Sequence, residues 1–290
     1  MSTKPRIAFI GTGLMGQPMA ANLLRAGFPL NAWNRSTDKT QPLTVLGGTV
    51  HDTPAQAVRD ADIIITMLLN DDIVESILAD IGPSLQPGQM VIDMSSIAPR
   101  MARLHAVRLA QSEIAYLDAP VSGGTVGATE ATLAIMAGGS ADAFERAKPV
   151  FAAMGRATLV GPNGAGQLAK LANQAIVAIT IGAVSEALLL AKGGGAEPAA
   201  VRSAITGGFA DSRILNLHGA RMLTGNFTPG GPIVTQIKDI KNILDEAADI
   251  GLDLPFVQLA YRLFQEAAAN GLGGLDHSAL YQHLATMNKL

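Results

Sequence analysis

Three glycines near the start of the chain have the spacing of a phosphate cradle. They lie in Gly11-Thr12-Gly13-Leu14-Met15-Gly16, after an apolar run and before a helix-like segment. The first glycine would allow a tight turn, the second a close approach of the backbone to a pyrophosphate, and the third close helix–strand packing. The N–H groups at the helix start would then face the phosphates. The pattern predicts a dinucleotide site; a turn that keeps its glycines for packing alone is the alternative.

The residues expected to meet the adenosine ribose include no acid. The second strand should end about 20 residues further on, where an Asp or Glu would hold the ribose 2′-hydroxyl of NAD. The sequence there reads Asn34-Arg35-Ser36. A guanidinium next to a hydroxyl can bind a 2′-phosphate instead. We therefore expect NADP to be preferred, with NAD possible, although a solvated arginine in a turn would give the same residues.

A second glycine-rich segment could hold a carboxylate. Ser122-Gly123-Gly124 follows an expected strand and would present one hydroxyl beside unobstructed backbone N–H groups. An ordinary glycine-rich turn is the simpler explanation of this segment taken alone.

A lysine with two amide neighbours is the candidate for acid–base chemistry. Lys170, Asn173 and Gln174 stand at i, i+3 and i+4, so a helix places them on one face. The apolar residues around Lys170 could tune its pKa for proton transfer. A solvated helical lysine fits the spacing equally well. Lys238 lies in a later segment, 238–242, which by itself reads as a solvated polar face.

Composition excludes several other chemistries. The 290 residues include no cysteine, which removes disulfides, thiolate metal sites and cysteine nucleophiles. The formal net charge is −3 without a basic run, so we expect no nucleic-acid partner. We expect no metal. The five histidines lie outside the segments above and are expected to be structural or exposed: His51, His105, His218, His277 and His283.

The N-terminal run 7–16 resembles a signal peptide in composition, but its glycines have the better explanation given above. No apolar stretch reaches the length of a membrane helix, about 20 residues, without Gly, Pro or charge interrupting it. We expect a soluble cytoplasmic protein with no membrane partner.

The elements that must position these residues divide the chain in two. The first half alternates apolar runs with helical patterns, which predicts a doubly wound parallel α/β sheet. Strands are expected at 7–10, 62–68, 90–93, 115–118, 132–137 and 157–160, and helices at 14–26, 54–60, 71–80, 98–111 and 141–154. The second half is helical, beginning with a long segment at 165–192 and continuing at 197–206, 212–223, 234–250, 256–270 and 277–288. We expect a dinucleotide-binding domain at 1–162 and an all-helical domain at 163–290.

Five segments in this order give the chain a family resemblance. GTGLMGQPMAANLLRAG (11–27), DMSSIAP (93–99), DAPVSGG (118–124), GAGQLAKLANQ (164–174) and IKD (237–239) resemble the motifs of the β-hydroxyacid dehydrogenase family, related to 3-hydroxyisobutyrate dehydrogenase. The resemblance covers essentially the whole chain. It implies a Rossmann-type domain, a long helix and a helical C-terminal domain that assembles into a homo-oligomer, a dimer or tetramer.

The resemblance also implies roles for residues. It makes Lys170 the catalytic lysine and places the substrate carboxylate on Ser122, Gly123 and Gly124. Cofactor contacts fall on the Gly11–Gly16 turn, Ser96 and Lys238, and we add Met67 and Leu68 at the end of the strand 62–68. Many members carry a substrate-binding asparagine four residues after the lysine. Here Gln174 stands at that place and Asn173 one residue earlier, so either amide could contact substrate.

The implied activity is NADPH-dependent reduction of a small carboxylate-bearing aldehyde. DMSSIAP, KLANQ and DHSAL (276–280) favour the branch that reduces 2-hydroxy-3-oxopropionate, or tartronate semialdehyde, to glycerate, with Lys170 as proton donor. Oxidation of 3-hydroxyisobutyrate or another β-hydroxy acid is the alternative. A reductase-like module that binds without catalysis is a remote one.

Overall fold

The protein folds into two compact units. The structure, a computed structural model, describes residues 4–290. One unit ends at Lys170 and the other begins at Leu171. The expected boundary at 162/163 stands at the turn before α8 (Ala165–Gly193), and this helix runs through the observed division.

The first unit is built on a nine-stranded sheet. Its strands are β1 (Ile7–Ile10), β2 (Leu30–Trp33), β3 (Thr49–Val50), β4 (Ile63–Thr66), β5 (Met90–Asp93), β6 (Ala115–Asp118), β7 (Val121–Ser122), β8 (Leu133–Gly138) and β9 (Gly155–Gly161). The order β3-β2-β1-β4-β5-β6 is parallel throughout and is that of a Rossmann fold. The predicted doubly wound fold is confirmed. The far end of the sheet is mixed, because β8 runs antiparallel to β6 and β7.

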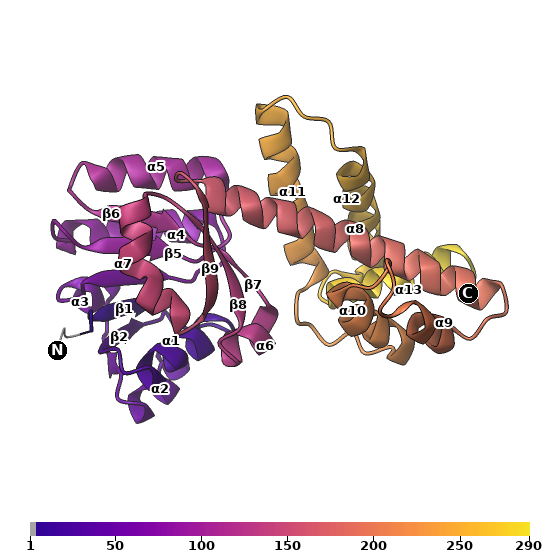
Figure 1. The fold of residues 1–290 in the computed structure, drawn as a ribbon, viewed down its shortest axis with the longest axis horizontal. Coiled ribbons are helices and arrows are strands. Elements are labelled where there is room, and N and C mark those ends of the chain that lie inside the picture. Colours follow the sequence, from indigo (N-terminus) through magenta and orange to yellow (C-terminus); the bar gives the residue numbers. More distant parts are fainter. Residues whose placement is uncertain (1–3) are drawn as a thin grey trace. The chain divides into compact units, whose positions relative to one another are not determined.

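Helices cover both faces of this sheet (Figure 1). They are α1 (Gly16–Arg25), α2 (Gln41–Val45), α3 (Pro54–Val58), α4 (Asp71–Ile81), α5 (Pro99–Ala110), α6 (Gly124–Thr129) and α7 (Ala141–Ala152), with short 3-10 turns at Thr37–Lys39 and Gly82–Ser84. Alternate residues of β1 point into the two cores on opposite faces of the sheet. Ile7 and Phe9 belong to the core that includes α1 and α7, and Ala8 and Ile10 to the core that includes α3, α4 and α5. This explains why the strands are apolar at consecutive positions.

The sequence analysis misses four short elements, α2, β3, β7 and α6. None exceeds six residues. Such lengths carry less than two helical turns or two strand repeats, so they leave no readable periodicity. The helix α1 also begins at Gly16 rather than at residue 14, so the turn residues Gly11–Met15 lie before the helix.

The second unit is helical. After α8 come α9 (Pro198–Ile205), α10 (Arg213–Thr224), α11 (Ile233–Asp249), α12 (Pro255–Ala267) and α13 (Leu280–Met287), with a kinked π turn at Ala268–Leu272 and a 3-10 turn at His277–Ala279. Ala178, Ile181 and Leu188 of α8 lie in the core of this unit. By length and composition α8 is the one helix in residues 4–290 that could cross a membrane, but a core helix passes the same test.

Candidate active site

The three glycines of the first turn have different surroundings. Gly11 has a φ of +98°, and a Cβ there would lie 2.4 Å from the carbonyl oxygen of Met67. A Cβ on Gly16 would lie 2.0 Å from the carbonyl oxygen of Gly11. Both positions therefore exclude larger residues on steric grounds. At Gly13 a Cβ would meet nothing within 4 Å, so the space above this residue is open.

The segment after β2 is tied to the same turn. The side-chain oxygen of Asn34 accepts a hydrogen bond from the backbone N–H of Thr12 at 3.0 Å, and its amide nitrogen donates to the carbonyl of Ser36 at 3.0 Å. Arg35 is exposed and Ser36 half-buried. Asn34 thus fixes the conformation of the loop, whereas the side chain of Arg35 is exposed to solvent.

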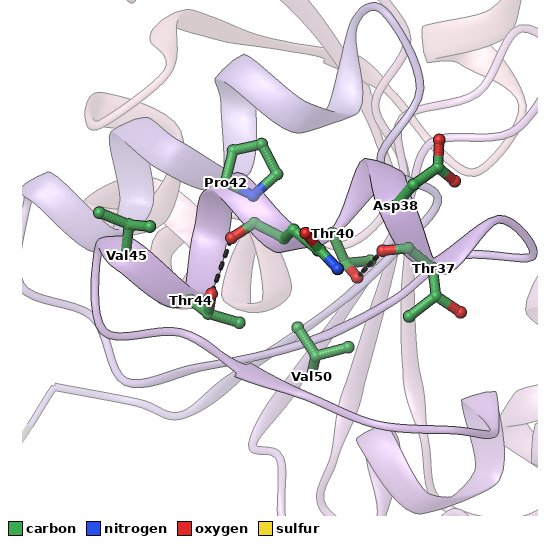
Figure 2. A pocket seen from close by; sticks show the side chains of 8 residues that line it. Thr37, Asp38, Thr40, Pro42, Thr44, Val45 and Val50 are labelled. Atoms are coloured by element: carbon green, nitrogen blue, oxygen red, sulfur yellow. Dashed lines mark hydrogen bonds between the residues drawn. The ribbon is translucent and has the colours of Figure 1, made fainter.

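A cavity of about 590 Å³ lies beyond this loop (Figure 2). It is lined by Thr37, Asp38, Thr40, Gln41, Pro42, Thr44, Val45 and Val50. Two of its threonines are engaged locally, since Thr40 donates to the Thr37 carbonyl and Thr44 to the Gln41 carbonyl. None of the predicted cofactor or substrate contacts lines this cavity, so it forms no part of the candidate site.

The ends of β4 and β5 are joined by a buried network. Asp93 accepts hydrogen bonds from the Thr66 hydroxyl at 2.8 Å and from the Ser95 N–H at 3.0 Å. The Ser95 hydroxyl in turn accepts from the backbone N–H of Leu68 at 2.9 Å. Burial raises the pKa of Asp93, against these hydrogen bonds. The structure thereby brings Leu68 and its half-buried neighbour Met67 to the strand end that carries Ser96.

Asp118, at the end of β6, holds the start of α8. Its carboxylate accepts from the backbone N–H of Gly164 at 2.8 Å and of Gln167 at 2.9 Å. Burial raises the pKa of Asp118 to about 6, although both N–H donors act to lower it. Asp118 is fully buried and Gln167 is 1% exposed. Both stand inside segments that carried the resemblance, but no local pattern showed that they meet.

The proposed carboxylate cradle forms a short hairpin and helix start. Ser122 ends β7, opposite Ala134 of β8, and is half-buried. Gly123 and Gly124 follow with φ values of +144° and +62°, which L side chains rarely adopt. Their backbone conformation therefore explains the pair of glycines, and Gly124 is exposed at the surface of the unit.

The predicted face of α8 is formed, and part of it belongs to a network in the second unit. Asn173 donates to the side-chain oxygen of Gln174 at 2.9 Å, and Gln174 donates to Asp239 at 2.6 Å. Lys238 lies 3.3 Å from the other Asp239 oxygen. Asp239 is 6% exposed, so the expectation of a solvated polar face is wrong for this residue. Lys170, one turn earlier on α8, is the last residue of the first unit.

His105, His218 and His283 are buried, as expected of structural residues, and His51 and His277 are half-buried. His218 and His277 are joined at 3.3 Å and lie next to Asp276, an arrangement that could in principle ligate a metal. However, Asp276 already accepts hydrogen bonds from Ser278, Gly230 and Gly231, and Arg221 lies 2.6 Å away. An adjacent guanidinium opposes a bound cation, so we interpret the cluster as a structural joint.

The pKa shifts support this interpretation. Burial alone would raise the pKa of Asp276, but hydrogen bonds from His218 and Ser278 outweigh it and hold that pKa below its ordinary value. Burial lowers the pKa of His277 to about 4, and the neighbouring His218 acts in the same direction. The Asp276 carboxylate lies 3.5 Å from His218, and His277 is hydrogen-bonded to His218 and Gln236, so the cluster forms one connected joint.

Comparisons with known proteins agree with this geometry. Residues 6–161 match the family described as the NAD binding domain of 6-phosphogluconate dehydrogenase, and residues 164–284 match that described as NAD-binding of NADP-dependent 3-hydroxyisobutyrate dehydrogenase. The chain is 45% identical to 2-hydroxy-3-oxopropionate reductase of Escherichia coli, over 97% of this chain and 98% of that one. It is 41% identical to NAD-dependent L-serine dehydrogenase of Pseudomonas aeruginosa, over 66% of each.

Solved structures give the same result. The 3-hydroxyisobutyrate dehydrogenase of Mycobacterium tuberculosis, solved with L-serine, superposes with a TM-score of 0.90 at 31% identity and covers 97% of this chain and 99% of its own. Both units are included in that match. The chain belongs to the 3-hydroxyisobutyrate dehydrogenase-related family of NAD(P)-dependent β-hydroxyacid dehydrogenases.

Proposed function

We propose that this enzyme uses NADPH to reduce a small carboxylate-bearing aldehyde, 2-hydroxy-3-oxopropionate, to glycerate. The observation that carries the proposal is the 45% identity to the Escherichia coli reductase named for that substrate, over nearly the full length of both chains. The segments DMSSIAP, KLANQ and DHSAL favour the same branch of the family.

The first unit fits a dinucleotide at the glycine-rich turn. The open space above Gly13 admits a pyrophosphate, and the hydroxyl of Thr12 is buried without a hydrogen-bond partner among residues 4–290. The ribose loop offers Asn34, Arg35 and Ser36 and no acid, which supports NADPH over NADH. Met67, Leu68, Ser96 and Lys238 complete the proposed contacts. When bound, NADPH supplies the hydride that reduces the carbonyl carbon.

The chain's own residues would then handle charge and protons. Ser122, Gly123 and Gly124 bind the substrate carboxylate through a hydroxyl and backbone N–H groups. Lys170, as ammonium, stabilises the developing alkoxide and donates a proton to its oxygen. In the reverse direction neutral Lys170 accepts the hydroxyl proton.

Of the two amides near Lys170, we assign the substrate contact to Asn173. Gln174 uses its oxygen to accept from Asn173 and its nitrogen to donate to the buried Asp239. Gln174 therefore orients Asn173, whose side-chain oxygen remains on the face of α8 that carries Lys170.

We also propose a cytoplasmic homo-oligomer. Ile176, Ala183, Ala187 and Leu190 of α8 are exposed and share one helix face, with Ile176 66% and Leu190 78% exposed. An apolar stripe of this kind suits burial against another copy. Ala178, in contrast, is buried in the core of its own unit. Sedimentation analysis of Leu190→Glu against wild type tests the stripe, and an unchanged mass would contradict it.

The competing assignment is oxidation of 3-hydroxyisobutyrate or another β-hydroxy acid. The second family description, which names 3-hydroxyisobutyrate dehydrogenase, and the relative named for L-serine support this alternative.

A substrate panel separates the two assignments. Initial rates are measured from the change in cofactor absorbance. The aldehydes 2-hydroxy-3-oxopropionate and methylmalonate semialdehyde are tested with NADPH and NADH, and glycerate, 3-hydroxyisobutyrate and L-serine with NADP and NAD. The proposal expects the highest kcat/KM for 2-hydroxy-3-oxopropionate with NADPH. A higher kcat/KM for methylmalonate semialdehyde or L-serine would contradict the assigned substrate, and a higher value with NADH would contradict the assigned cofactor.

A further inference from the structure

The first turn of α8 is capped by a side chain that is distant in sequence. The backbone N–H groups at a helix start have no partners within the helix. Asp118 accepts from two N–H groups here, those of Gly164 and Gln167, at 2.8 and 2.9 Å. Asp118 stands 46 residues before Gly164, so this cap joins the end of β6 to α8.

Gln167 extends this joint to the end of β5. Its amide nitrogen donates to the carbonyl of Ser95 at 2.8 Å, and its amide oxygen accepts from the N–H of Ile97 at 3.2 Å. These two backbone groups flank Ser96, a proposed cofactor contact. Because Gln167 is 1% exposed, bulk water cannot substitute for either bond.

Two glycines allow the backbones at this joint to approach closely. A Cβ on Gly166 would lie 2.4 Å from the carbonyl oxygens of both Asp118 and Met136. A Cβ on Gly138 would lie 2.7 Å from a carboxylate oxygen of Asp118. The start of α8 is thus held by backbone packing as well as by hydrogen bonds, and it has little freedom to shift.

We propose that Asp118 and Gln167 are positioning residues for the reaction, which fix Lys170 on α8 relative to the strand end that carries Ser96. Lys170 stands three residues after Gln167, about 4.5 Å along the helix axis. The inference rests on the proposed role of Lys170 as proton donor. Proton transfer requires heavy atoms about 2.6–3.2 Å apart, so a small shift of the helix start would slow it.

A carboxylate at position 118 suits this positioning role. A buried carboxylate costs stability, and an exposed helix start is ordinarily capped by a nearby Ser, Thr or Asp. A carboxylate gives two acceptor oxygens with fixed geometry, and here each takes one N–H of the same helix turn. An asparagine of the same shape would keep one acceptor and turn an NH₂ group toward the other N–H donor.

The variants Asp118→Asn and Gln167→Met test the proposal. A misplacement of about 1 Å can cost about 100-fold in rate, so we expect kcat to fall by about 10- to 100-fold in each. NADPH affinity should stay close to wild type in Asp118→Asn, which keeps the Gln167 side chain that bonds on either side of Ser96. Ser140→Ala is the matched control, because it removes the hydroxyl that caps α7 by accepting from the Ala143 N–H, and α7 carries no proposed site residue. It should leave kcat unchanged.

A double-mutant cycle with Lys170→Ala distinguishes positioning from general damage. If Asp118 acts through Lys170, Asp118→Asn should change kcat by less than about threefold in the Lys170→Ala background. An equal loss of kcat in both backgrounds, or an undiminished kcat in Asp118→Asn, would overturn the proposal. If circular dichroism shows that Asp118→Asn fails to fold, the same cycle with Gln167→Met decides. Full kcat in Lys170→Ala alone would instead refute the proposed function.

Discussion

Arg35 is the residue on which the proposed cofactor preference depends. We predict that Arg35→Ala weakens NADPH binding much more than NADH binding, because only NADPH carries the 2′-phosphate. A hydrogen bond to a charged group contributes about 1.5–3 kcal/mol, which corresponds to roughly 10- to 100-fold in affinity. The single tryptophan, Trp33, ends β2 directly before this loop, so energy transfer from its indole to the reduced cofactor measures binding.

Lys39→Ala provides the control for Arg35, since it removes a neighbouring exposed cation outside the proposed contacts. It should affect the two cofactors equally and weakly. If Arg35→Ala raised both dissociation constants by the same factor, the assignment of Arg35 to the 2′-phosphate would be wrong.

Ser122 tests the carboxylate cradle. Ser122→Ala should raise the substrate KM by about 10- to 100-fold through loss of a hydrogen bond to a carboxylate. NADPH affinity, followed through Trp33, should be nearly unchanged. Thr125→Ala is the control, because Thr125 is exposed on the helix that follows. A parallel loss of NADPH affinity in Ser122→Ala would place this loop in the cofactor site instead.

At the scale of single residues, sequence reasoning succeeded where a local rule applies. The helical period put Lys170, Asn173 and Gln174 on one face, and the glycine spacing located the turn at 11–16. It failed for Asp239, because its partner Gln174 lies 65 residues away and nothing near Asp239 indicates burial. The hydrogen bond between Asp118 and Gln167 was not predicted either, because these residues lie 49 positions apart.

At the scale of elements, α8 offers a direct comparison of two glycines. Gly166→Ala should destabilise the protein by at least about 1–3 kcal/mol, because its Cβ would overlap two carbonyl oxygens. Gly182→Ala, in the same helix, has open space around the added carbon and should stabilise it by about 0.5–1 kcal/mol. Urea unfolding measures both free energies. Equal changes in the two variants would show that packing around Gly166 is looser than the structure indicates.

Long elements were predictable and short ones were not. The four strands β1, β4, β5 and β6 left continuous apolar runs because both faces of the sheet are covered there. By contrast β3 and β7 have two residues each, and their pairing is decided by neighbours in space. The antiparallel direction of β8 likewise depends on the β7 hairpin, which carries no strong turn signal.

For the whole molecule, the change from strand–helix alternation to a long Pro-free run predicted an α/β half followed by a helical half. The sequence did not indicate where the contacts of the two units divide. A glycine- and proline-containing turn at 161–164 marks the start of α8, but contacts separate the two units only at 170/171. A continuous helix hides such a division, because its hydrogen bonds and periodicity are the same on both sides.

The central claim, that this is a reductase with Lys170 as its proton donor, is tested most directly by single-turnover hydride transfer in Lys170→Ala. General acid catalysis contributes about 10²–10⁴-fold, so the rate should fall by that factor. Folding and NADPH affinity should survive, since a helix accepts alanine readily. Lys170→Arg should also be slow, because a guanidinium cannot readily give up its proton. A Lys170→Ala rate above about a tenth of wild type, with chemistry rate-limiting, would contradict the account.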